Sequence, residues 1–176
     1  MSLGPSPTQD LGQIFDEHFA YVWACLRRLD VRDADLEDQA HEVFLKVHSR
    51  LADYDPTRPI RPWLFAFIYR TASDYRRLAR HRVEVLGASQ EAVDPEQPAD
   101  VAMQASEDRA LLLAALDTVE LERRAVLILH ELDEVPVPAI SHALGIPLGT
   151  AYSRLRLGRE DLAGAVKRLR NRRGDK

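Results

Sequence analysis

Residues 137–159 constrain the fold of this chain more than any other stretch, because their pattern predicts two helices joined by a tight turn. Gly145 favours a left-handed helix end, and Pro147 marks the start of the second helix. That helix has an apolar stripe made of Leu148, Ala151, Leu155 and Leu162. Arginines elsewhere on it carry guanidinium groups, which suit phosphates and guanine edges. The stretch therefore predicts a helix-turn-helix whose second helix enters a DNA groove, with a solvated surface hairpin as the alternative.

Charge is placed unevenly along the chain, and this placement is more informative than the net charge of -4. Residues 61–82 contain six Arg against one Asp, and residues 148–176 contain nine Lys or Arg against three acids. Residues 83–108 contain seven acids and no Lys or Arg. Two basic blocks, each suited to nucleic acid, are thus separated by an acidic spacer.

Helical periodicity predicts an all-α fold of two small helical domains, because strand alternation is absent throughout the sequence. Amphipathic helices are expected over 11–26, 36–51, 63–82, from Ser106, and over 121–132. The expected organisation is a disordered tail over 1–9, a first domain over 10–82, a flexible acidic linker over 83–106 and a second domain over 107–171 that contains the helix-turn-helix.

Several classes of protein are excluded or disfavoured by residue content. The single cysteine, Cys25, rules out an internal disulfide framework and a cysteine-based zinc site. No secretory signal or 18-residue apolar run is present, so a cytoplasmic protein is expected. His41, Glu42 and His48 allow a small helical enzyme or metalloprotein, but they lack a third convergent ligand and an activated nucleophile.

The block 63–82 combines aromatic side chains with positive charge. A buried stripe of Leu64, Phe67, Ile68, Thr71, Tyr75 and Leu78 is expected on one side. Trp63 and Tyr69 are interleaved with arginines elsewhere. Unpaired bases stack on aromatic rings, at about 1–3 kcal/mol per base, while guanidinium groups hold the backbone. The block therefore predicts a surface for single-stranded nucleic acid.

The order of these parts resembles the bacterial RNA polymerase sigma factors of the extracytoplasmic-function (ECF) type, which have only sigma domains 2 and 4. The resemblance covers about residues 10–170. The matching residues in the first domain are Asp35, Glu37, Asp38, Glu42, Val43, Phe44, Trp63, Leu64, Asp74, Tyr75 and Arg77. The matching residues in the helix-turn-helix are Leu144, Gly145, Ile146, Pro147, Gly149, Thr150, Ser153, Arg154 and Leu155.

This resemblance implies a function and a set of contact residues. Core RNA polymerase would bind Asp35, Glu37, Asp38 and Glu42. The minus-10 element of promoter DNA would bind Arg61, Trp63, Arg70, Arg76 and Arg77. The minus-35 element would bind Thr150, Tyr152, Ser153, Arg154, Arg156 and Arg159. An anti-sigma factor is an expected partner, whereas a catalytic role, a cofactor, a metal, a small-molecule substrate and membrane insertion are not expected.

Some positions depart from the family's usual residues. Arg70 stands where Asn is frequent, Tyr152 where Lys or Arg is common, and Leu157 and Gly158 replace the usual Arg and Ala. The common minus-35 sequence is therefore not carried over to this chain. The remaining alternative is a conventional helix-turn-helix regulator that binds an operator without polymerase, although such a protein has no need of the block 63–82.

Overall fold

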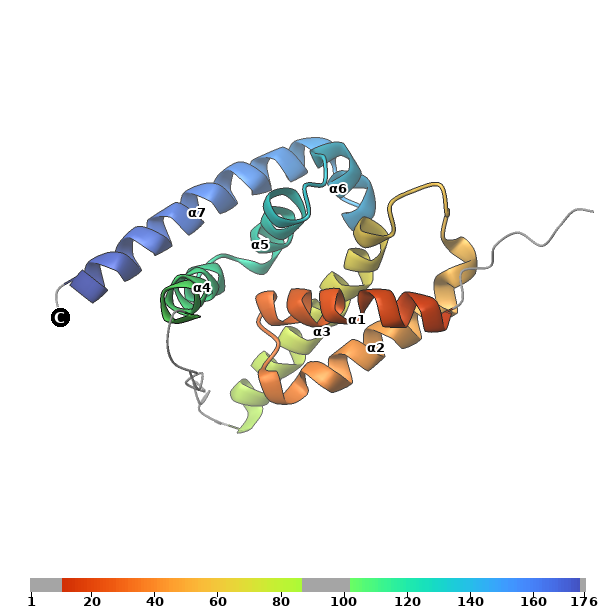
Figure 1. The fold of residues 1–176 in the computed structure, drawn as a ribbon, viewed down its shortest axis with the longest axis horizontal. Coiled ribbons are helices and arrows are strands. Elements are labelled where there is room, and N and C mark those ends of the chain that lie inside the picture. Colours follow the sequence, from red (N-terminus) through yellow and green to blue (C-terminus); the bar gives the residue numbers. More distant parts are fainter. Residues whose placement is uncertain (1–10, 87–101, 175–176) are drawn as a thin grey trace, which may run out of the picture.

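A computed structural model describes residues 11–86 and 102–174, and every regular element within these ranges is helical. The expected all-α fold is thereby confirmed (Figure 1). The helices are α1 (Leu11–Arg28), α2 (Leu36–Arg50), α3 (Ile60–Leu86), α4 (Ala102–Asp117), α5 (Leu121–Leu127), α6 (Val137–Leu144) and α7 (Leu148–Gly174). Three short turns of helix join them, namely η1 (Asp33–Asp35), η2 (Leu51–Asp53) and η3 (Ile128–Leu132).

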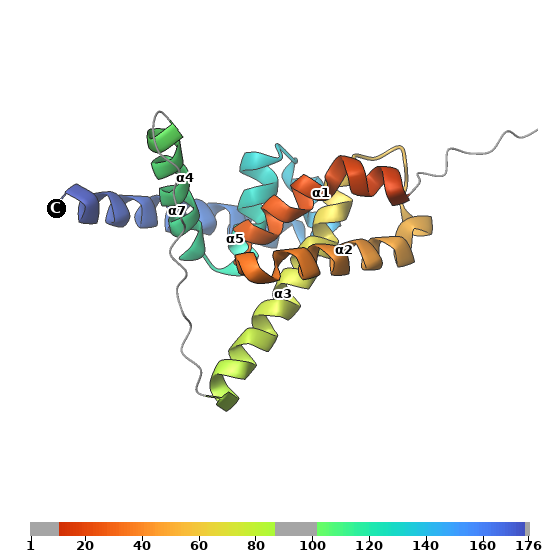
Figure 2. The same cartoon turned by 60° about the horizontal axis from the view of Figure 1, so that its bottom comes forward.

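Helices α1, α2 and α3 pack against one another through their apolar stripes. The stripe expected on α2 is buried and consists of Leu36, Ala40, Val43, Phe44 and Val47. Helix α1 ends where Asp30 takes a left-handed conformation with φ of 71°, which Asp tolerates better than most residues. Figure 2 shows that the end of α3 extends away from α1 and α2.

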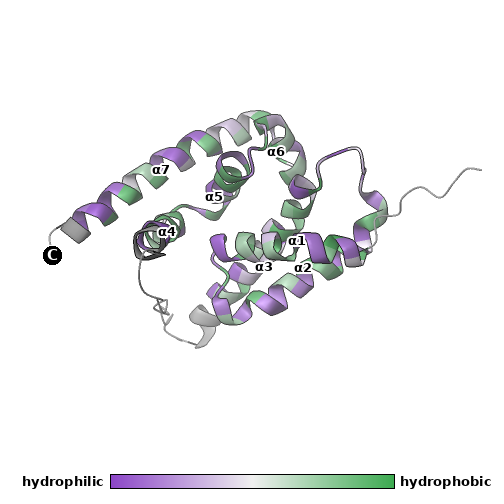
Figure 3. Cartoon of the chain, viewed as in Figure 1, coloured by the Kyte–Doolittle hydropathy of each residue, from purple (hydrophilic) through white to green (hydrophobic). Residues whose placement is uncertain are grey.

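Helix α7 organises the second group of helices, because α4, α5 and α6 all pack against it. Its 27 residues form one long helix along an edge of the molecule in Figure 1. The first group is in contact with the second: α6 packs on α3, and α4 touches α1. Buried side chains of both groups form one apolar cluster, and Figure 3 shows hydrophobic residues where α6 meets α3.

Some boundaries differ from those expected from sequence. Helix α7 continues to Gly174, beyond residue 171, where the second domain was expected to end. Helices α3 and α4 extend into the predicted linker from both sides, reaching Leu86 and starting at Ala102. The tail 1–9 and residues 87–101 of the predicted linker lie outside the described residues.

Two leucines of the predicted stripes are exposed. Leu78 is 60% exposed because it lies on the part of α3 that extends beyond its neighbours, and Leu148 is 45% exposed as the first residue of α7. Within the described ranges, no helix is both long and apolar enough to cross a lipid bilayer.

Candidate nucleic-acid interface

The turn between α6 and α7 has the geometry expected of a helix-turn-helix. Gly145 ends α6 with φ of 64°, a conformation that side-chain-bearing residues adopt at a cost. The Ile146 N–H donates to the Ser141 carbonyl at 3.1 Å, and the Ser141 hydroxyl donates back to the Ile146 carbonyl at 2.7 Å. These paired bonds close the turn, so the direction of α7 relative to α6 is set by local structure.

The first turns of α7 present a polar face to solvent. Tyr152 is 53% exposed, and Ser153 and Arg156 are exposed beside it, while Ala151 and Leu155 are buried beneath. The Ser153 hydroxyl donates to the Thr150 carbonyl at 3.0 Å, and Thr150 itself is half-buried. Arg156 pairs with Glu160 one turn later at 2.7 Å. This face has the exposure that contact with base edges in a major groove requires.

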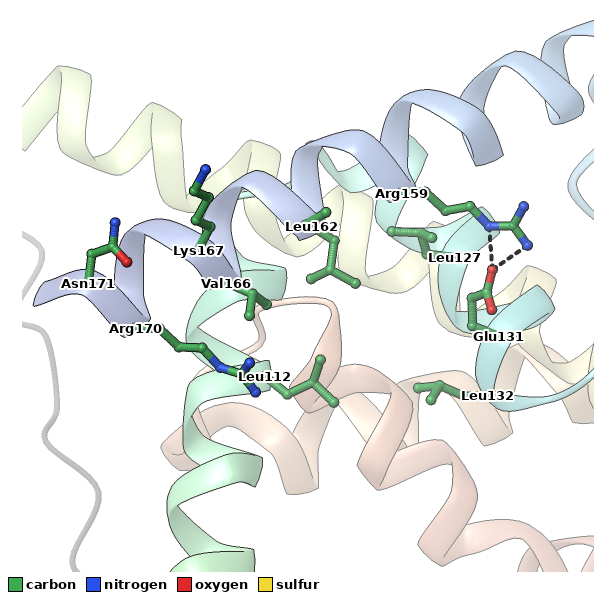
Figure 4. Close-up of a pocket in the computed structure, with 11 residues that line it drawn as sticks. Leu112, Leu127, Glu131, Leu132, Arg159, Leu162, Val166, Lys167, Arg170 and Asn171 are labelled. Carbon is green, nitrogen blue, oxygen red and sulfur yellow. Dashed lines mark hydrogen bonds and ion pairs between the residues drawn. The ribbon is translucent and has the colours of Figure 1, made fainter. Parts of the chain in front are cut away.

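Two other arginines predicted for α7 lie close to neighbouring elements. Arg154 is half-buried beside α3, where its charge lowers the pKa of Tyr69 against the larger rise caused by burial. Arg159 forms an ion pair with Glu131 of η3 at 2.7 Å, above an open groove between α4, η3 and α7 (Figure 4). Arg154 is therefore less open to solvent than the polar face of α7, whereas Arg159 shares that face and is 55% exposed while it pairs with Glu131.

The arginines predicted on α3 are spread along the helix. Arg61 is exposed, with its guanidinium 5.1 Å from the centre of the Tyr21 ring, and Arg70 is exposed one-third of the way along. Arg76 lies 3.5 Å from the Asp30 carboxylate, while Arg77 pairs with Asp74 at 3.3 Å. From residue 61 to residue 77 the helix rises about 24 Å, so these cations form a line and not a pocket.

Trp63 packs against two aromatic rings. The ring centres of Tyr54 and Phe67 each lie 4.9 Å from that of Trp63. Before α3, the loop is ordered by its own hydrogen bonds: Asp55 accepts from the Thr57 amide at 3.0 Å, and the Tyr54 hydroxyl donates to the Arg58 carbonyl at 2.6 Å. The bonds from Thr57 lower the pKa of Asp55. A preformed loop thus leads directly into the aromatic start of α3.

The four acids predicted to bind polymerase divide into two environments. Glu37 and Asp38 are exposed in the first turn of α2, and Glu42 is exposed and pairs with Lys46 at 3.4 Å. Asp35 instead accepts a hydrogen bond from the Tyr75 hydroxyl at 2.6 Å and pairs with Arg32 at 2.8 Å. Asp35 therefore ties η1 to α3, whereas the other three form a solvated acidic surface on α2.

Comparison with known proteins places α2, α3 and the helix-turn-helix within matches to one family. The family model "Sigma-70 region 2" matches residues 14–82, and "Sigma-70, region 4" matches residues 109–162. Over 144 residues the chain is 35% identical to the ECF RNA polymerase sigma factor SigL of Mycobacterium tuberculosis, covering 81% of this chain and 80% of SigL. The chain belongs to the ECF family of RNA polymerase sigma factors.

Two solved structures share the fold of this sigma factor at 20% identity. One is the sigma factor RpoE of Bartonella quintana in complex with the anti-sigma factor NepR, with a TM-score of 0.69 over 90% of this chain and 98% of RpoE. The other is CnrH in complex with the cytosolic domain of CnrY, with a TM-score of 0.63 over 89% of this chain and 87% of CnrH.

Sequence reasoning missed one residue on the acidic surface of this sigma factor. Leu45 is 66% exposed on α2, one turn after His41 and Glu42 and two turns after Asp38. The signal was present, because Leu45 does not fall on the buried stripe of α2 and has no apolar partner predicted for it. Leu45 therefore adds exposed apolar surface beside the acids of α2.

Residues considered for metal binding or nucleophilic chemistry lie in ordinary structural environments. In the described ranges, no three His, Cys, Asp or Glu side chains gather as metal ligands would. His41 stacks on Phe15 with ring centres 6.3 Å apart. Cys25 is fully buried, and burial raises the pKa of its thiol to about 12, which keeps it protonated and unreactive at neutral pH.

Proposed function

We propose that this chain binds core RNA polymerase, brings it to promoters with matching minus-10 and minus-35 elements, and assists strand opening. The observation that carries this proposal is the order of two surfaces on one chain, an aromatic and basic α3 followed by a helix-turn-helix, within matches to sigma regions 2 and 4. No catalytic step is assigned to the chain itself. Its work with polymerase is expected to take place in the cytoplasm.

The minus-35 element is assigned to the start of α7. Tyr152, Ser153 and Arg156 would contact base edges from the face that is already exposed. Thr150 would contact the backbone at the entry of the helix, and Arg154 and Arg159 would join the interface after leaving α3 and Glu131. A tyrosine at position 152 contributes ring surface and one hydroxyl in place of a cation, so a thymine methyl group is a suitable neighbour for it.

The minus-10 element is assigned to the loop 54–60 and to α3. Trp63, held in place by contacts with Tyr54 and Phe67, would be the platform for an unstacked base. Arg61 and Arg70 would hold the single strand near that platform, and Arg76 and Arg77 would follow the duplex further along α3. Extruding a base costs a few kcal/mol, which stacking and phosphate contacts offset.

Core polymerase is assigned to α2. A basic surface of polymerase would pair with Glu37, Asp38 and Glu42. Leu45, which is exposed among these acids, would make the apolar contact. Asp35 would support the surface through its hydrogen bond from Tyr75. Leu45→Lys should weaken the affinity for core polymerase by at least tenfold, because it removes the apolar contact and places a cation against the basic surface of polymerase. Leu78→Lys is the matched control, because Leu78 is similarly exposed on α3 but away from α2. Equal loss in both variants would contradict the assignment.

An anti-sigma factor is proposed as the inhibitory partner. One structural neighbour, RpoE, is bound to the anti-sigma factor NepR, and another, CnrH, is bound to the cytosolic domain of CnrY. The acidic surface on α2 is the surface for which polymerase and an inhibitor would compete, and the groove between α4, η3 and α7 is a second surface open to an inhibitor. Co-expression with a candidate inhibitor, followed by competition against core polymerase, tests this partner.

A further inference from the structure

The last turns of α7 carry cations that the minus-35 assignment does not use. These cations are exposed, and none of them forms an ion pair with another described residue: Lys167, Arg168, Arg170 and Arg172. Residues 162–174 contain no Asp or Glu, so this part of α7 offers them no neutralising partner. Like charges this close repel one another, and binding of an anion relieves the repulsion.

Neither the usual pairing of surface arginines nor the helix dipole accounts for this surplus of positive charge. Several exposed arginines elsewhere on the chain are paired with a carboxylate, as Arg156 is with Glu160 at 2.7 Å. A helix C-terminus favours cations only within its last turn. That effect covers Arg172 but not Lys167, which lies two turns before the end of α7. An unpaired basic segment on an exposed helix face is instead typical of a phosphate-binding surface.

Two of the four cations lie on the same face of α7 as the residues assigned to base edges. Eighteen residues make five full turns of an α-helix, so residues 18 apart point in the same direction. Lys167 follows Gly149 by this interval, and Arg170 follows Tyr152 by it, on one unbroken helix. In Figure 4 neither cation meets a carboxylate among the side chains drawn. The exposed polar face at the start of α7 therefore continues as a basic face near its end.

Distance along α7 places this basic face outside the bases that the start of the helix would contact. From Arg156 the helix rises about 17 Å to Lys167 and about 21 Å to Arg170, at 1.5 Å per residue. A major groove is only about 12 Å wide. Each DNA strand carries one phosphate per about 3.4 Å of duplex, so these distances correspond to about five or six base pairs. Both cations are thus within range of flanking backbone and too far for the same bases.

We propose that Lys167 and Arg170 form a second DNA contact, which binds backbone phosphates about five or six base pairs to one side of the bases that Arg156 contacts. Asn171, one turn after Lys167, is exposed and adds an amide donor for the same backbone. Phosphate contacts carry no base sequence, so this contact fixes the position of α7 and adds affinity. The inference rests on the proposed function for which bases Arg156 meets, but the affinity of the two cations for duplex phosphate does not.

The test compares two double variants of the full chain in the holoenzyme, on a promoter from which it makes a transcript. Lys167→Gln/Arg170→Gln removes the proposed contact. Arg168→Gln/Arg172→Gln is the matched control, because it removes two exposed cations from the same segment, and Arg172 lies on the flank of Arg154, 18 residues earlier.

Ethylation interference shows which phosphates the holoenzyme needs. Wild type and control should be blocked by ethylation of phosphates five or six base pairs beyond the minus-35 bases, and Lys167→Gln/Arg170→Gln should not. Persistence of this interference in Lys167→Gln/Arg170→Gln, or its loss in both variants, would overturn the proposal.

Salt dependence tests the same cations without polymerase. For the full chain on a duplex of unrelated sequence, the slope of log affinity against log salt should fall by about two in Lys167→Gln/Arg170→Gln and by less than about 0.5 in Arg168→Gln/Arg172→Gln. An unchanged slope would overturn the proposal and favour an acidic protein as the partner of this face. If the holoenzyme makes no transcript from any promoter, the proposed function fails, whereas the slope still decides whether Lys167 and Arg170 bind phosphate.

Discussion

Gly158 tests whether the packing of α7 is as tight as the structure indicates. A Cβ added at this position would lie 3.0 Å from Cδ1 and Cγ of Leu127 and 3.3 Å from the Arg123 carbonyl oxygen. Leu127 is buried and the carbonyl is backbone, so neither can move away easily. Overpacking costs about 1–3 kcal/mol, while Ala in place of Gly inside a helix contributes about 1 kcal/mol. Gly158→Ala should therefore lower the free energy of unfolding by up to about 2 kcal/mol.

Gly164→Ala is the matched control for this prediction. Gly164 lies in the same helix, and an added Cβ would meet only Nη1 of Arg168, the far end of a flexible side chain. This change should raise the free energy of unfolding by about 0.5–1 kcal/mol. Urea unfolding followed by circular dichroism measures both variants. If Gly158→Ala stabilises the protein as much as Gly164→Ala does, the reasoning about α5 and α7 is refuted.

Three further outcomes are expected. Arg154→Ala should cost the holoenzyme about 1–3 kcal/mol in promoter binding and relax preference at one minus-35 position; a uniform loss over all sequences would make it a backbone contact. Arg159→Ala should reduce the slope of log affinity against log salt by about one, and an unchanged slope would mean that Arg159 stays with Glu131. Because burial raises the pKa of Cys25 from 9.0 to about 12, the unfolded state loses its proton first as pH rises. The free energy of unfolding should therefore fall between pH 9 and 12. In the Cys25→Ala variant, measured by urea unfolding at the same pH values, it should fall less steeply.

Much of the fold follows from sequence because helical spacing and helix-ending residues are local signals. The stripe on α2, the left-handed Gly145 and the restart after Pro147 each predicted an element that the structure contains. Leu78 was assigned to the buried stripe by the same spacing and is exposed, because periodicity identifies a face but not where the neighbouring helices end. The extent of α7 was missed for a related reason, since a basic segment has no apolar signal of its own.

The sequence could predict which residue types form the candidate site, but not the contacts and burial of their side chains. Sequence could place Arg154, Arg156 and Arg159 on one helix, but it could not show that Arg154 is half-buried near Tyr69 and that Arg159 pairs with Glu131. Those contacts join residues far apart in the chain, and no short-range pattern encodes them. Nothing in the sequence indicated that Arg124 is buried and donates a hydrogen bond to the Arg28 carbonyl. A buried arginine differs from an exposed one only in its partners, which the sequence does not show.

The most direct test of the central claim is run-off transcription with bacterial core polymerase, this chain and a pool of upstream DNA regions. The account predicts defined transcripts that appear only when the chain is present, and that weaken when Tyr152, Ser153 and Arg156 are replaced together by alanine. Transcripts would also identify the minus-10 and minus-35 elements. Absence of any transcript together with absence of polymerase binding would contradict the account.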